Sequence, residues 1–413
     1  MLTESKRPQL TRCRASLLAV AAGVICGVAG NSVASDHLDS PTTIANPQAD
    51  IGDVFAWTSP NGRQLNLIMT IVGHSFSDRI QYVFHVDSGK QFGRTTASTS
   101  IVCKFQTSSL VDCRAGTADS ARGDASNPEG LQGRNHRFRV FAGPRDDPFF
   151  NNVRGAAVAY QVAATALRNG AVVDAAGCPA FDHATSASIF DEWRHTDHGP
   201  PKNFLAGWLS SALVISIDLD VVAKGGKILA IWGATVSHGK QLDRAARPLT
   251  GNTLLGTMAT AEMSNELKEA YNAANPATSA RFIPEIEQGL AVYDGFDGHC
   301  GNQLLADKDA KPAARYQRLA TVLADDRLWV NSESTVCTQL FAVEFASLAG
   351  QTSFAQDCGG RTPLYSAANI YRSILVDGTV NSVSDGLDHD EREHSATVFP
   401  FLAAPDATPG AKP

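Results

Sequence analysis

The sequence predicts a mostly β protein, with an antiparallel β-sandwich-like core and helical additions in the C-terminal half. Short stretches rich in β-branched and aromatic residues recur through the first half of the 413-residue chain, and turn-forming residues separate them, as is typical of strands. These strands do not alternate regularly with helices, so a parallel sheet is not expected. We treat residues 35–402 as a single β-rich domain.

The strand pattern is clearest near the start of this domain. Strands are predicted at residues 53–57, 65–72, 80–86, 138–141, 212–222 and 228–236. A Ser-Pro-Asn-Gly sequence at residues 59–62 predicts a turn between the first two strands. Residues 115–135 are polar and rich in glycine, which indicates a surface loop.

Helical spacing of apolar residues appears in the second half. Helices are predicted at residues 264–274, 313–323 and 338–348. Pro276 ends the first of these patterns. Residues 370–375 suit either a helix or a strand, and the Ala-, Pro- and Gly-rich residues 403–413 predict a disordered tail.

Residues 1–34 have the order of a secretory signal peptide. Basic residues come first, residues 17–30 carry no charge, and small residues lead up to Ala34. The uncharged run is shorter than the ~20 residues that a membrane-spanning helix needs, although an uncleaved anchor is the competing interpretation. We expect cleavage after Ala34, a secreted or periplasmic location, and no membrane span in the mature chain.

The charge balance bears on the kind of partner. The formal net charge of the whole chain is −7, and removal of the basic leader makes it more negative. Such a surface repels phosphate backbones, so nucleic acid is excluded as an expected partner. A small molecule, a glycan or another protein stays open.

Six cysteines follow the leader, and an even number in an oxidising compartment predicts three disulfides. Cys103 and Cys113 lie on two strand-like stretches around a short turn, so we expect them to pair. The pairing of the others is open; they are Cys178, Cys300, Cys337 and Cys358.

A cluster of histidines and acids around residues 182–198 is a candidate metal site. His195 and His198 are three residues apart, which would place them on one face of a helix, with Asp197 between them. Imidazole and carboxylate ligands suit zinc, copper or iron. The competing interpretation is a solvated polar loop, because Gly-Pro-Pro follows at residues 199–201.

Two further places could hold a divalent cation. Asp388, His389 and Asp390 lie in the densest acidic run of the chain, which is equally consistent with a solvated loop. Cleavage after Ala34 would expose Ser-Asp-His, so that the amine, two backbone nitrogens and His37 could bind copper(II). His37 packing against the first strand is the alternative.

Several motifs resemble those of the bacterial domain-of-unknown-function family 4331. They lie at residues 47–56, 141–150, 244–249 and 399–405. The motif at 141–150, Phe-Ala-Gly-Pro-Arg-Asp-Asp-Pro-Phe-Phe, is the most specific. The resemblance implies an exported protein without an established activity. In many relatives an acidic turn follows the second strand pair, whereas residues 86–90 here carry one acid and one lysine, which makes calcium binding there doubtful.

Within the 141–150 motif, Arg145, Asp146, Asp147 and Phe149 allow two interpretations. Paired carboxylates can share a proton or bind a cation. Alternatively, Asp-Pro forms a turn, Arg145 neutralises an acid and the Phe side chains fill the core.

The sequence assigns no catalytic residue and no certain cofactor, and a divalent metal is the one candidate. The signatures of common hydrolases, kinases and dinucleotide-binding enzymes are absent from the sequence. The expected function is therefore that of an exported, non-catalytic ligand-binding or accessory protein. The alternative is a metal-dependent hydrolase or oxidoreductase that uses His195 and His198.

Overall fold

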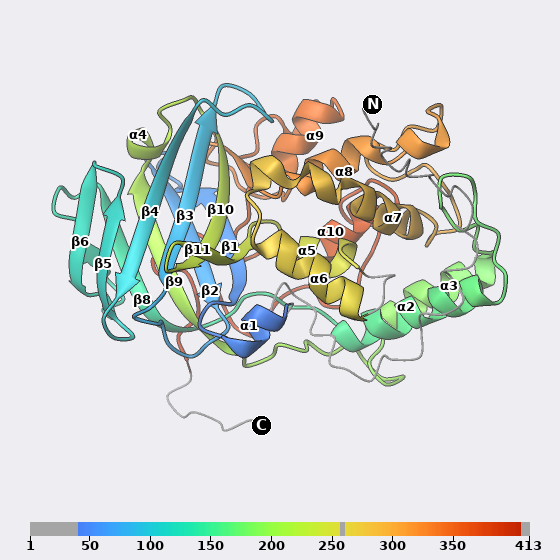
Figure 1. Ribbon diagram of the computed structural model, residues 1–413, viewed down its shortest axis with the longest axis horizontal. Helices are drawn as coiled ribbons and strands as arrows, with labels where there is room; N and C mark the ends of the chain where they lie inside the picture. Colours follow the sequence, from blue (N-terminus) through green and yellow to red (C-terminus); the bar gives the residue numbers. More distant parts are fainter. Residues whose placement is uncertain (1–39, 257–260, 406–413) are drawn as a thin grey trace, which may run out of the picture.

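Two antiparallel sheets and a group of helices make up the fold, and the predicted class is confirmed. The computed structural model describes residues 40–256 and 261–405. The sheets occupy one side of the molecule and most helices the other (Figure 1). No helix within the described ranges is long and apolar enough to cross a membrane.

The first sheet has the strand order β1-β2-β9-β8-β7. Its strands are β1 (Ile51–Thr58), β2 (Gln64–Ile71), β7 (Leu131–Gln132), β8 (Phe138–Asp146) and β9 (Leu209–Asp218). Strands β1 and β2 form the predicted hairpin, in which the turn amide of Gly62 donates to the carbonyl of Ser59. Gly62 has φ +66°, a conformation that glycine adopts without strain.

The second sheet has the order β11-β10-β3-β4-β5-β6, and β12 pairs with β10 as well. Its strands are β3 (Gln81–Gly89), β4 (Ala97–Phe105), β5 (Leu110–Ala115), β6 (Asp119–Asp124), β10 (Ile228–Ser237), β11 (Lys240–Ala245) and β12 (Leu328–Asn331). Strand β1 packs against β10 and β11 of this sheet. Every residue of β1 is buried, because this strand of the first sheet packs against the second sheet and against the segment around Arg361.

Two expectations about the first half are wrong. Residues 115–135 include strands β6 and β7 rather than a continuous loop. Strand β6 pairs with β5 and forms the edge of the second sheet, although its polar sequence is not typical of a strand. Residues 86–89 belong to β3 rather than to a separate turn. Asp87 there forms an ion pair with Arg327 at 3.0 Å, which occupies its carboxylate.

The helices of the described residues lie beyond β8, apart from one short helix that precedes β1. They are α1 (Pro41–Ala45), α2 (Val153–Arg168), α3 (His183–Trp193), α4 (Leu219–Val222), α5 (Thr250–Leu254), α6 (Ala261–Asn272), α7 (Ile283–Asp294), α8 (Gln317–Ala324), α9 (Ala342–Leu348) and α10 (Ala367–Val376), with 3₁₀ segments η1 (Pro276–Phe282), η2 (Pro312–Ala314) and η3 (Thr352–Phe354). The ambiguous residues 370–375 are helical within α10.

The sequence pattern missed α2 and α3, which lie before the midpoint of the chain. Each begins at a side chain that accepts a hydrogen bond from the first turn. Asn152 accepts from the amide of Gly155 at 3.2 Å, and Asp182 accepts from the amide of Thr185 at 2.8 Å. Such caps stabilise a helix start by about 1 kcal/mol.

The predicted boundary of the tail is too early. The amide of Asp146 donates to the carbonyl of Ala403 at 3.1 Å, and Arg392 donates to the carbonyl of Ala404 at 2.9 Å. Residues 403–405 therefore belong to the folded part, because they complete the hydrogen bonding at the end of β8. The rest of the predicted tail lies outside the described residues, as do the predicted signal peptide and His37.

Three disulfides cross-link the fold. The predicted pair Cys103–Cys113 joins directly opposite positions on β4 and β5. The other two pairs, which the sequence left open, are Cys178–Cys300 and Cys337–Cys358.

The lengths of the closed loops predict unequal contributions to stability. Cys178–Cys300 spans 122 residues and Cys103–Cys113 spans 10. In the chain-entropy description, loss of the long link lowers the unfolding free energy by about 5 kcal/mol and loss of the short one by about 3 kcal/mol. Urea unfolding of the two paired Cys→Ala variants measures both values. A larger loss for the Cys103/Cys113 variant would contradict this ordering.

Candidate functional site

The end of strand β8 gathers charged side chains from three distant parts of the chain. Asp146 and Asp147 are adjacent in sequence and both buried. Their backbone is fixed on two sides, because the amide of Asp146 donates to Ala403 and the amide of Asp147 donates to the carbonyl of Trp208 at 3.3 Å. The two carboxylates then meet different partners.

Asp146 lies among residues of the C-terminal segment. His394 Nε2 is 3.4 Å from Asp146 Oδ2 and 2.9 Å from Asp390 Oδ2. Arg392 Nε is 3.4 Å from the other oxygen of Asp146. Asn203 donates to Asp390 Oδ1 at 3.1 Å. Asp146 and Asp390, two candidate residues of the sequence analysis, thus both contact the imidazole of His394.

The protonation of His394 follows from these neighbours. Burial alone lowers the pKa of His394, but hydrogen bonds to Asp146 and Asp390 and the charges of both raise it to about 9. The imidazolium ion is therefore favoured at neutral pH. The 3.2 Å contact of the Ala403 amide to Nδ1 needs an unprotonated nitrogen. A second proton, on Nδ1, would therefore have to displace this contact, while the charge-assisted hydrogen bonds of the imidazolium to the carboxylates would favour that protonation.

Asp147 faces strand β1 instead. It forms a hydrogen bond with Asp53, and Arg361 forms an ion pair with Asp53. Burial raises the pKa of Asp53, while the charge and hydrogen bond of Arg361 and the hydrogen bond of Asp147 oppose the rise. A hydrogen bond between two carboxyl groups requires a proton on one of them, and the raised pKa of Asp53 favours uptake of that proton beside the guanidinium of Arg361.

The remaining residues of this motif are core residues. The guanidinium of Arg145 stacks on Phe141, 4.1 Å from the ring centroid. Phe149 is buried, and Arg361 lies 5.5 Å from its ring centroid. The aromatic residues therefore fill the core, Arg145 lies on Phe141, and the two carboxylates meet different partners.

The histidine cluster does not have the helical arrangement expected from its spacing. Helix α3 ends at Trp193, and Asp197 and His198 have positive φ. This is a turn, because Gly-Pro-Pro follows directly. Asp197 forms an ion pair with Arg154 at 2.9 Å. Within the described ranges, the groups of three closely spaced ligand atoms include neither His195 nor His198.

The side chains of the acidic run at residues 385–394 differ in their exposure to solvent. Asp388 and His389 are exposed, whereas Asp390 is buried beside His394. The sequence reasoning did not single out His394. The i,i+4 spacing of Asp390 and His394 could have pointed to their contact, but nothing in the sequence indicates that Asp146 lies next to both.

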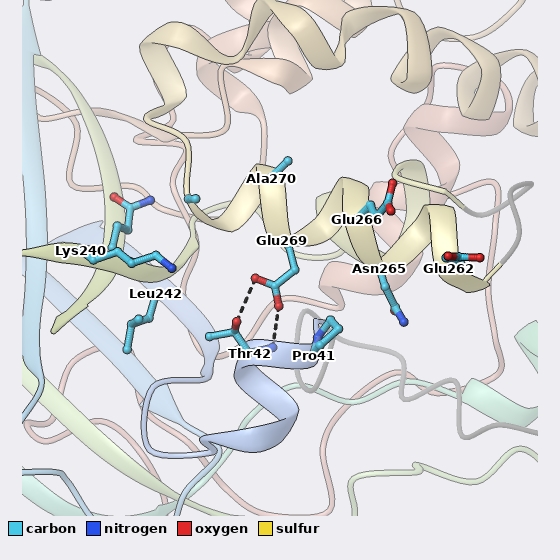
Figure 2. A pocket seen from close by; sticks show the side chains of 11 residues that line it. Pro41, Thr42, Lys240, Leu242, Glu262, Asn265, Glu266, Glu269 and Ala270 are labelled. Atoms are coloured by element: carbon cyan, nitrogen blue, oxygen red, sulfur yellow. Dashed lines mark hydrogen bonds between the residues drawn. The ribbon is translucent and has the colours of Figure 1, made fainter.

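A surface pocket of about 540 Å³ lies between α1, β11 and α6 (Figure 2). Glu269 closes one side, since it accepts hydrogen bonds from the amide and hydroxyl of Thr42 at 2.6 and 2.9 Å. The lining residues are Pro41, Thr42, Lys240, Gln241, Leu242, Glu262, Asn265, Glu266, Glu269, Ala270 and Ala273. The pocket thus combines apolar surface with three glutamates and one lysine.

Comparison with protein-family models, with curated proteins and with solved structures finds no match to this chain. The resemblance to family 4331 accordingly stays a prediction that rests on the motifs alone.

The buried acid pair predicts a pH effect on stability. Because the pKa of folded Asp53 lies above its ordinary value of 3.8, its contribution to stability is fully present below pH 3.8 and declines as the pH rises through the folded pKa. An Asp53→Asn variant has no carboxyl group at this position that could take up a proton. The unfolding free energy of the variant minus that of the wild type should therefore increase between about pH 4 and about pH 8.

Urea unfolding at both pH values measures this difference. An Asp388→Asn variant makes the same chemical change at an exposed position and serves as the control. A difference for Asp53→Asn that does not change with pH would show that Asp53 keeps its ordinary pKa in the folded protein.

Proposed function

We propose that this chain is an exported, non-catalytic binding protein that takes a small cationic ligand in the pocket between α1, β11 and α6. The observation that carries the proposal is the composition of this pocket (Figure 2). Its volume of about 540 Å³ falls in the range of about 300–1,000 Å³ that small-molecule sites occupy.

The lining favours one chemistry of ligand. Glu262 and Glu266 are exposed acidic side chains on α6, whereas Glu269 is held by Thr42. Leu242 and Ala270 offer apolar surface next to these acids. A protonated amine on an apolar body matches this arrangement, and the net negative charge of the chain attracts such a cation.

Two acids with raised pKa values, Asp326 and Glu344, lie in the core and not in the pocket, which favours binding over catalysis there. Burial raises the pKa of Asp326 and of Glu344, and the charge of Arg247 opposes the rise at both. Glu344 accepts a hydrogen bond from Arg247 at 2.9 Å inside the core. These groups are paired structural charges and do not line the pocket, so they are not placed to act on a ligand there.

Export to the periplasm or the exterior is part of the proposal, as is membership of family 4331. Three disulfides support export, because such links persist in oxidising compartments. The leader-like residues 1–34 and the motif at residues 141–150 come from the sequence.

Calorimetry with 4-phenylbutylamine tests the ligand class. We expect binding by the wild type, weaker binding of the neutral 4-phenylbutanol, and about a two- to fivefold loss for each of Glu262→Gln and Glu266→Gln, as exposed charge pairs contribute. Glu333→Gln removes an exposed charge outside the pocket and should leave the affinity unchanged. Equal affinity for the amine and the alcohol would overturn the proposed ligand class.

A further inference from the structure

The side chains at the end of β8 do not line the pocket, and they include potential metal ligands. We propose that Asp146, Asp390 and His394 form a binding site for a divalent first-row transition metal such as zinc. Each residue offers one ligand atom, and these atoms all lie within 4.8 Å of one another. They come from β8 and from the segment that follows α10, so the fold alone brings them together.

The separations suit metal ligands. Zinc lies about 2.0–2.2 Å from imidazole nitrogen and carboxylate oxygen, so two ligands in a tetrahedral arrangement are about 3.3–3.6 Å apart. His394 Nε2 is 3.4 Å from Asp146 Oδ2 and 2.9 Å from Asp390 Oδ2. An opening of a few tenths of an ångström between His394 and Asp390 would admit the ion.

A poorly satisfied oxygen points to a ligand at this place. Asp146 Oδ2 is buried and makes only a long contact of 3.4 Å with His394 Nε2, and the side chains of Asp146 and His394 are each 2% exposed. A buried carboxylate oxygen without a good donor is costly. A cation bound between Asp146 and His394 would remove that cost.

Neighbouring groups already hold the ligands in position. Arg392 pairs with Asp146 Oδ1, which leaves Oδ2 directed at His394. Asn203 donates to Asp390 Oδ1, which leaves Asp390 Oδ2 for the same space. Outer contacts of this kind orient metal ligands, and their loss typically weakens metal binding 10- to 100-fold.

The ligand types select the ion. One imidazole with two carboxylates suits zinc, manganese or iron, whereas calcium prefers six to eight oxygen ligands. Zinc would replace the proton on His394 Nε2, and a proton on Nδ1 would then have to displace the contact from the Ala403 amide. Three protein ligands leave the fourth tetrahedral position for water or an exogenous group.

Zinc titration of the chelator-treated full chain tests the site. The wild type should bind one zinc ion at this site, and Asp390→Asn and His394→Ala should each weaken binding at least tenfold. Asp388→Asn and His389→Ala change exposed neighbours in the same segment and should leave binding unchanged. A His37→Ala background removes the separate N-terminal copper-type site. Calcium should not compete.

X-ray absorption of the zinc-loaded wild type keeps the test independent of whether the variants fold. Only nitrogen and oxygen ligands at about 2.0–2.2 Å are expected. Absence of zinc binding by the folded wild type would overturn the proposal, as would full affinity in a folded His394→Ala variant. Either result leaves amine binding in the pocket unaffected, so the two proposals fail separately.

Discussion

Pairing of buried charge at the end of β8 is the constraint on which the arrangement of the chain's two ends depends. A carboxylate in the protein interior is costly unless a partner compensates it. Asp147 finds its partners through Asp53 on β1 and Arg361, and Asp146 finds His394 and Arg392. Two adjacent residues therefore require the first strand and the last segment to meet at the same place.

The same physical rule operates where the helices meet the sheets. Arg247 follows β11 and donates to Glu344 on α9 at 2.9 Å. Arg372 on α10 donates to Asn151, just before α2, at 3.0 Å. Each contact joins segments far apart in the sequence. Since a buried pair returns little net stability but is costly to break, such contacts select one packing of the helices over its competitors.

The two proposed sites differ in what the fold contributes. The pocket at α6 is shallow, and its carboxylates are solvated, so a ligand there gains moderate affinity from charge and apolar contact. The Asp146–Asp390–His394 group is enclosed, so any bound ion is held by direct bonds. An ion there would fasten the C-terminal segment to β8.

Local patterns in the sequence determined the strands of β1, β2, β3 and β10, the turn at residues 59–62 and the Cys103–Cys113 link. In each case the interacting residues are close in sequence, or the side-chain alternation is set by a buried face. The polar strand β6 was missed because its pairing with β5, and not its composition, makes it a strand. Only the tertiary structure decided that Cys178 meets Cys300 and that Asp146 meets His394. These contacts join residues more than a hundred positions apart, and the path of the chain between them is set by the packing of the whole core.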